Sequence, residues 1–209
     1  TLVQAKADVR LACALAPTHL SYYELTLEPG TPFYQQPPTL PDDELLLAFQ
    51  DQGQTLLAAA GLEQYEISAY ARTGQQCRHN RNYWEFGDYL GIGAGAHTKL
   101  TDTEGCVNRY ALCKHPATYQ ATAVTERYRE QRLLQPDDLI AEFMLGALRL
   151  TDGFPQALFA ARTGLPWTAL ALPLAEAETR GWLTQVTGWV RVTPLGQRYL
   201  NTVIALFFP

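Results

Sequence analysis

Apolar residues recur at helical spacing in three parts of the chain. The first covers residues 1–16 and stops before Pro17, since the residue before a proline is pushed out of the α region. The second follows Pro41, opens with acidic residues that suit a helix N-terminus, and stops at Gly61. The third opens at Pro136 and carries an apolar face. This spacing predicts a helix in each part.

Short apolar and aromatic runs between turn formers predict strands at residues 19–25, 65–68 and 107–112. The helix after Pro41 lies between the first two strands. This strand–helix–strand order predicts parallel strands with helices packed outside them. Residues 117–133 are rich in Arg and Glu, and we expect them to form a further helix.

The segment that follows Pro136 has the element order of a winged-helix module. Its helices lead to a strand candidate at residues 189–192 and to a final helix at residues 197–207. No repeat or low-complexity linker separates this segment from the strands before it. We therefore expect two domains, at residues 1–116 and 117–209.

Charge argues against a nucleic-acid-binding function. The 209 residues include 16 Lys and Arg against 21 Asp and Glu, a net charge of −5. From Pro136 onward, the sequence has five arginines and six acidic residues, a net charge of −1. Residues 166–172, the expected recognition segment, have no basic side chain. A DNA-binding regulator is therefore disfavoured, and we expect no nucleic-acid partner.

The four cysteines, at positions 13, 77, 106 and 113, form no zinc or iron–sulfur motif. Dispersed, reduced thiols are typical of cytoplasmic proteins. The longest apolar stretches are too short to span a bilayer. Because the sequence starts at Thr1 without a methionine, we interpret it as a fragment.

Residues 71–97 have little periodicity and concentrate Gly, Arg, His, Asn, Tyr and Trp, a composition typical of binding loops. A neutral His79 would be a good axial ligand for heme iron, and Tyr83 and Trp84 offer flat faces to a porphyrin. Alternatively, His79 and Asn80 bond to loop backbone while the two aromatic rings fill the core. Three arginines have the planar shape that suits propionate carboxylates: Arg72, Arg78 and Arg81.

The glycine-rich run at residues 91–96 allows the backbone to approach a ligand closely, because glycine has no Cβ. It does not match the dinucleotide-binding pattern. The alternative is a buried strand whose glycines permit tight packing inside a barrel.

Five ordered stretches carry a resemblance to a known family: residues 25–31, 41–43, 66–71, 79–84 and 91–97. They resemble the radical SAM proteins of the HemN/HemW group. The HNxxYW pattern of residues 79–84 points to the heme chaperones of that group. The resemblance implies an α/β fold: the C-terminal strands and helices of a partial (β/α) radical SAM barrel, then a mostly helical, winged-helix-like domain.

The resemblance also implies functional residues. Heme or porphyrin would contact His79, Asn80, Arg81, Tyr83 and Trp84, while Thr26, Glu28, Gly93 and His97 would lie near S-adenosylmethionine. His97 stands where the related oxidase has an aliphatic residue, and it is a second candidate iron ligand. The family's CxxxCxxC motif is absent, so we expect S-adenosylmethionine and the [4Fe–4S] cluster only in the full-length protein and no activity from the fragment alone.

The function implied is delivery of heme to acceptor proteins, including membrane-associated ones. The alternative within the group is an oxygen-independent coproporphyrinogen III oxidase, which decarboxylates propionates by radical chemistry.

Overall fold

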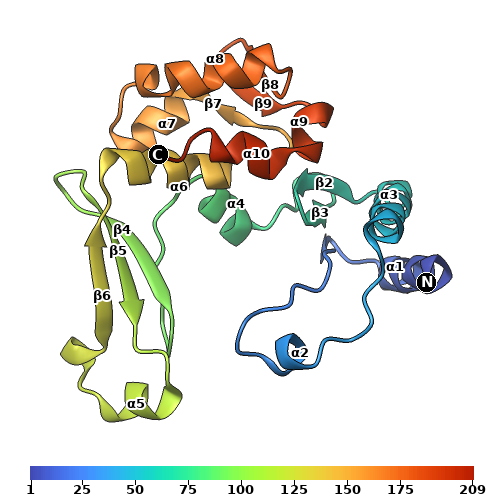
Figure 1. Cartoon of the computed structure of the whole chain (residues 1–209), viewed down its shortest axis with the longest axis horizontal. Helices are drawn as coiled ribbons and strands as arrows, with labels where there is room; N and C mark the ends of the chain where they lie inside the picture. Colours follow the sequence, from blue (N-terminus) through green and yellow to red (C-terminus); the bar gives the residue numbers. More distant parts are fainter. The chain divides into compact units, whose positions relative to one another are not determined.

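The computed structural model describes residues 1–209, which form two compact units, Thr1–Cys77 and Arg78–Pro209 (Figure 1). The predicted domain boundary at residues 116/117 lies within the second unit, and it stays a prediction. No helix is long and apolar enough to span a membrane.

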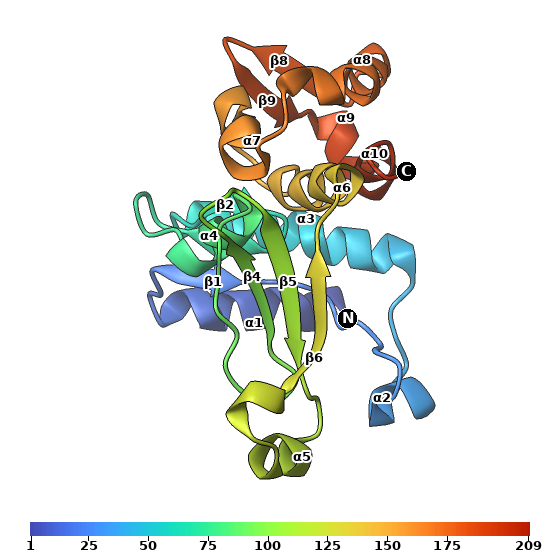
Figure 2. The ribbon, with the colours of Figure 1, turned by 90° about the vertical axis from the view of Figure 1, so that its left-hand side faces the viewer.

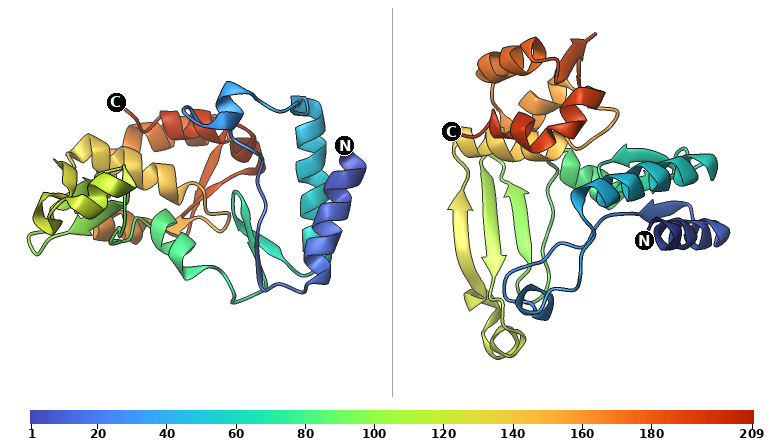
Figure 3. Two further views of the ribbon diagram at one scale, coloured as in Figure 1. Left: turned by 90° about the horizontal axis from the view of Figure 1, so that it is seen from below. Right: turned by 45° about the vertical axis from the view of Figure 1, so that its right-hand side comes forward.

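The two long helices of the first unit pack side by side (Figure 3). Helix α1 (Leu2–Ala14) is capped by Thr1, and α3 (Asp43–Ala59) begins after Asp42, whose carboxylate accepts a 2.8 Å hydrogen bond from the Leu45 N–H. Both helices match the prediction from apolar spacing. Their shared core is formed by Val9, Leu57, Leu62 and Tyr70.

The sheet of the first unit differs from the predicted parallel arrangement. Strands β1 (His19–Ser21), β2 (Glu63–Glu66) and β3 (Ala69–Ala71) have the order β1-β3-β2, and both pairings are antiparallel. The strands on either side of α3 therefore run in the same direction, but β3 separates them. The tight turn after Glu66 folds β3 back beside β2, where it takes the place that β1 would have occupied.

A long connection joins β1 to α3. The strand predicted at residues 19–25 ends at Ser21, and only α2 (Pro32–Gln35) interrupts the irregular backbone before Asp42. Thr31 starts this short helix by accepting a 3.2 Å hydrogen bond from the Tyr34 N–H.

The second unit contains a sheet of three neighbouring strands, β4 (His97–Thr101), β5 (Val107–Leu112) and β6 (Tyr128–Leu133), paired antiparallel in that order (Figure 2). The helix predicted over residues 117–133 is wrong for its second half. Only α5 (Pro116–Ala121) and the 3₁₀ helix η1 (Val124–Glu126) are helical. All six residues of β6 are exposed, so no alternation of apolar side chains marks it.

Residues 71–97, predicted to be irregular, contain one helix, α4 (Arg78–Trp84). The glycine-rich run is a loop, and the alternative of a buried strand is wrong. Gly93 and Gly95 have φ angles of 109° and 72°, which interrupt any extended run and which glycine adopts readily.

The rest of the second unit has winged-helix topology, as the sequence predicted. Helix α6 (Pro136–Ala147) is followed by β7 (Phe154–Pro155), α7 (Gln156–Thr163), the 3₁₀ helix η2 (Trp167–Leu170), α8 (Ala171–Thr179), and the hairpin β8 (Leu183–Val186) with β9 (Trp189–Val192). The sheet order is β7-β9-β8. The predicted last helix is split into α9 (Pro194–Arg198) and α10 (Leu200–Ala205).

Three phenylalanines from different elements meet in the centre of this module. The ring of Phe143 contacts Phe154 and Phe159 edge to face, with centroids 5.3 and 5.2 Å apart. Gly146, also in α6, lies close to the backbone of Tyr83 and Trp84 at the end of α4.

Candidate functional site

Helix α4 carries the whole HNxxYW motif, so these residues lie on a helix rather than on the expected loop. Residues four apart share a helix face, which places His79 beside Tyr83, with ring centroids 4.7 Å apart. Both side chains are exposed, Tyr83 by 37%. The ring nitrogens of His79 have no hydrogen-bond partner in the protein, so the alternative in which His79 bonds to backbone is not realised.

Tyr83 also contacts a third ring, that of Tyr89. The two tyrosine rings are stacked, with centroids 4.2 Å apart and planes at 20°. His79, Tyr83 and Tyr89 thus form a column of rings, the ring column, which leads from an exposed imidazole to a half-buried phenol.

Arg81 points to carboxylates of the protein itself. Its guanidinium lies 2.7 Å from Glu85 and donates two 3.0 Å hydrogen bonds to Asp152, in the turn after α6. Four contacts therefore occupy a group that has five N–H donors. Arg81 fixes α4 to the winged-helix module.

The C-terminal end of α4 is held by close packing. Asn82 donates a 2.9 Å hydrogen bond to the Asp88 carbonyl, and a Cβ on Gly87 would collide with the Asn82 side chain. Phe86 follows the helix with a φ of 55°, a left-handed conformation that is uncommon for a bulky residue. Its side chain is buried.

Trp84 and Asn80 are half-buried. The guanidinium of Arg149 lies 4.5 Å from the centroid of the Trp84 ring, a cation–π contact. The Trp84 indole N–H is buried without a hydrogen-bond partner. The motif therefore divides into two exposed rings, His79 and Tyr83, and residues that are packed against the protein.

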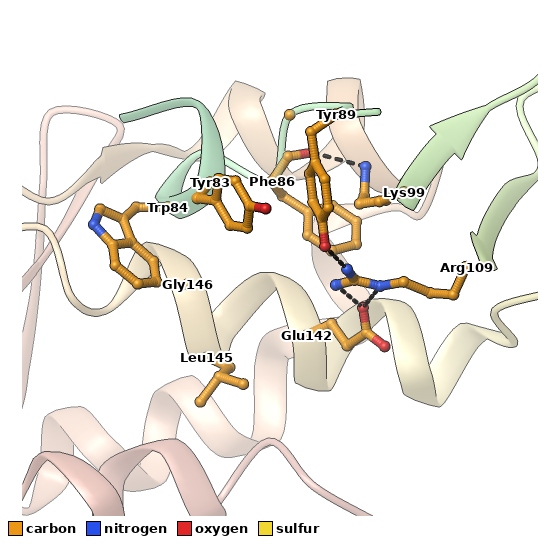
Figure 4. A pocket seen from close by; sticks show the side chains of 10 residues that line it. Tyr83, Trp84, Phe86, Tyr89, Lys99, Arg109, Glu142, Leu145 and Gly146 are labelled. Atoms are coloured by element: carbon orange, nitrogen blue, oxygen red, sulfur yellow. Dashed lines mark hydrogen bonds and ion pairs between the residues drawn. The ribbon is translucent and has the colours of Figure 1, made fainter. Parts of the chain in front are cut away.

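A cleft of about 330 Å³ opens between α4, the β4–β5 sheet and α6 (Figure 4). Its walls are mainly aromatic, and Glu142, Leu145 and Gly146 of α6 form its floor. The remaining lining residues are Tyr83, Trp84, Phe86, Gly87, Tyr89, Lys99 and Arg109. Tyr83 belongs both to the motif and to this cleft.

One charged pair crosses the cleft wall. Arg109 donates from Nε and Nη2 to the same Glu142 oxygen, at 2.9 and 2.6 Å, and from Nη1 to the Tyr89 hydroxyl. The other Glu142 oxygen accepts a 2.9 Å hydrogen bond from Arg132. Both oxygens of the carboxylate are thus bonded to arginines.

Lys99 is 1% exposed and supports the turn that follows α4. Its ammonium donates to the Phe86 carbonyl at 3.0 Å and to Asp88 at 2.8 Å, and lies 4.1 Å from the centroid of the Phe86 ring. Burial lowers the pKa of Lys99, and the bond to Asp88 opposes that shift only in part. Both hydrogen bonds of this lysine serve the turn.

Sequence reasoning missed Tyr89, Lys99 and Glu142. The aromatic cluster at residues 83–89 was a signal for the first. Glu142 stands beside the buried Phe143, but no spacing rule links it to Arg109, 33 residues earlier.

The residues expected near S-adenosylmethionine fall in both units. Thr26 and Glu28 are exposed on the irregular segment of the first unit. In the second unit, Gly93 has open space where a Cβ would be, and His97 is exposed at the start of β4, opposite Ala111. Their proximity to S-adenosylmethionine stays a prediction.

Glu66, at the end of β2, is 1% exposed and accepts a 3.0 Å hydrogen bond from the Ser68 hydroxyl in the turn between β2 and β3.

The residues present do not fit an iron–sulfur cluster. The four cysteines are free, and no three His, Cys, Asp or Glu side chains are grouped to hold a metal ion.

Comparisons with known proteins show what this chain is similar to in sequence and in fold. Residues 134–199 match the family model of the HemN C-terminal domain. Heme chaperone HemW of Escherichia coli (strain K12) is 43% identical over 99% of this chain and 54% of its own length, and that of Haemophilus influenzae is 41% identical over 99% and 53%. The chain spans about half the length of the curated relatives it matches.

A solved structure shares the fold. Coproporphyrinogen III oxidase (HemN) from Escherichia coli, described as a radical SAM enzyme, aligns over 95% of this chain and 50% of its own, with a TM-score of 0.70 and 16% sequence identity. The predicted class, an α/β chain with the C-terminal part of the HemN radical SAM fold, is confirmed. On these relationships, the chain belongs to the HemN/HemW family.

Proposed function

We propose that this chain supplies the heme-binding part of a heme chaperone, with His79 as an axial ligand of the iron. The observation that carries the proposal is the exposed His79 imidazole, which has no hydrogen-bond partner and lies beside Tyr83 with the ring planes tilted by 51°. A neutral imidazole with a free nitrogen suits heme iron, and the aromatic rings next to it offer apolar surface to a porphyrin. The relatives named as heme chaperones support the same function.

The rest of the predicted role follows from this proposal. S-adenosylmethionine and a [4Fe–4S] cluster would be held in the full-length protein, with Thr26, Glu28, Gly93 and His97 near the former. The cargo would pass to heme-accepting proteins, including membrane-associated ones, from a chaperone in the cytoplasm. Nucleic acid has no part in this scheme. Asn80 and Trp84 would support the heme face from the buried side of α4.

A heme titration of the full-length protein tests the proposal. We expect His79→Ala to weaken heme binding or to shift the Soret band, because an iron ligand is lost. His115→Ala removes an exposed histidine from the N-terminal end of α5 and serves as the matched control. An unchanged spectrum and Kd for His79→Ala, together with a loss for His97→Ala, would transfer the ligand role to His97.

The oxidase alternative has a direct assay. Anaerobic turnover of coproporphyrinogen by the full-length protein, without stable heme binding, would favour oxidative decarboxylation over heme delivery. The 43% identity to a protein named as a heme chaperone, against 16% to the oxidase, favours the chaperone.

A further inference from the structure

The cleft adjoins the Tyr83 and Tyr89 part of the ring column. Tyr83 contacts His79 on one side and stacks on Tyr89 on the other, and both tyrosines line the cleft. A flat ligand held at His79 would therefore have the cleft beside it. What the cleft offers such a ligand depends on its polar groups.

The guanidinium of Arg109, which lines the cleft, has N–H donors that are not used in hydrogen bonds within the protein. A guanidinium has five N–H donors, and three of them are used, two on Glu142 and one on Tyr89. One N–H on each terminal nitrogen remains. Glu142 and Tyr89 hold the guanidinium in place, so a second acceptor meets a group that is already ordered, which lowers the entropy cost of binding.

Tyr89 adds a hydroxyl at the same point. Its oxygen accepts from Arg109, and its proton, which interacts with the Tyr83 hydroxyl, can rotate to another acceptor. Burial raises the pKa of Tyr89, so the hydroxyl keeps its proton at neutral pH. Two kinds of donor thus converge beside the stacked rings (Figure 4).

The other charged residues around the cleft are committed elsewhere. Lys99 is bound to the Phe86 carbonyl and to Asp88, and both oxygens of Glu142 are bonded to arginines. Arg81, one of the three arginines expected from the sequence to bind propionates, is occupied by Glu85 and Asp152. Among the residues that line the cleft, Arg109 thus keeps the most N–H donors without a partner, and the Tyr89 hydroxyl lies beside it.

We infer that Arg109 and Tyr89 bind a propionate carboxylate of the heme whose iron is held by His79. This assignment rests on the proposed heme binding and names the part of the ligand that the cleft recognises. A planar macrocycle with carboxylates along one edge matches aromatic walls that end at an arginine fork. Arg109 is then the specificity residue for free heme over porphyrins whose acid groups are blocked.

The test compares heme with its dimethyl ester, in which both propionates are esterified, on the full-length protein. Binding of each is followed by Soret absorbance. We expect the wild type to bind heme at least about ten-fold more tightly than the ester, because a charge-assisted hydrogen bond is worth about one decade or more in Kd. Arg109→Gln should bind both compounds with similar Kd.

Arg132→Gln is the matched control. This substitution removes the second arginine that donates to Glu142, whose Nη2 lies 2.9 Å from Glu142 Oε1. Arg132 does not line the cleft. We expect this variant to keep the wild-type ratio of the two Kd values. Tyr89→Phe keeps the stacked ring, loses the hydroxyl, and should reduce the ratio in part; it also serves as the test if Arg109→Gln does not fold.

The outcomes separate this inference from the proposed function. A wild type that binds neither compound would contradict heme binding itself. A wild type that binds both equally, or Arg109→Gln and Tyr89→Phe variants that keep the full preference for free heme, would overturn the propionate assignment and leave His79 ligation standing.

Discussion

Arg81 and Asp152 are joined by two 3.0 Å hydrogen bonds between one guanidinium nitrogen and both carboxylate oxygens, across 71 positions of sequence. The contact ties α4 to the turn after α6 and so sets where His79 stands relative to the cleft. Its role is to position α4.

We expect Arg81→Ala to lower the free energy of unfolding by about 1 kcal/mol, since one nitrogen bonds both carboxylate oxygens and the arginine side chain is only 23% exposed. Urea denaturation measures the change. The swap Arg81→Asp with Asp152→Arg should recover part of the loss. If Arg81→Ala instead abolished the preference for free heme over its ester without affecting stability, Arg81 would be the propionate ligand.

Acid should weaken the turn after α4 through Asp88. Burial opposes ionisation of this carboxylate, but hydrogen bonds from Lys99 and Thr101 outweigh it and hold the pKa of Asp88 below its ordinary value. Between that lowered pKa and about 3.9, the unfolded chain binds more protons than the folded one. The contribution of Asp88 is therefore complete above about pH 4 and is lost as the pH falls through the folded pKa.

Urea unfolding of the wild type and Asp88→Asn at a series of pH values checks this. The stability difference between them should shrink below about pH 4. A difference that stays constant down to pH 2 would mean that the Asp88 charge does not stabilise the fold.

Gly91 is expected to tolerate no side chain. A Cβ at this position would collide with the His97 carbonyl, which is backbone and cannot rotate away. We predict that Gly91→Ala lowers the free energy of unfolding by about 1–3 kcal/mol. Ala94→Ser, in the same loop and exposed, should change it by less than about 0.5 kcal/mol. Equal effects of the two substitutions in thermal and urea unfolding would contradict the prediction, because they would show that the loop backbone moves to make room for a Cβ at position 91.

Anaerobic reconstitution of the 209-residue chain with iron and sulfide should give no cluster, because its four cysteines are free and dispersed. Iron and sulfide analysis with absorbance near ~400 nm, where thiolate-ligated clusters absorb, measures this. Stoichiometric iron and sulfide in the chain would contradict the prediction, whereas uptake only by the full-length protein agrees with it.

Local sequence predicted those elements whose own residues favour them. Asp42 caps α3, and α6 carries an unbroken apolar face, so both were found. Strand β6 was missed because its six exposed residues carry no pattern and pair with β5 only in the folded chain. In the site, the motif residues were found, but the Arg109–Glu142 bond depends on tertiary packing that no local pattern encodes.

The end of α4 shows how far the presentation of His79 depends on distant packing. No glycine or proline stops this helix at its last residue; the chain turns at Phe86, in a backbone conformation that a bulky side chain disfavours. The turn is held by the Lys99 ammonium and by the contact of Phe86 with Phe143 in α6. A seven-residue helix is also too short to persist alone in water. A synthetic peptide of residues 78–84 would therefore have the sequence of the motif without its helical geometry. Heme affinities measured on such a peptide would underestimate the heme affinity of the protein.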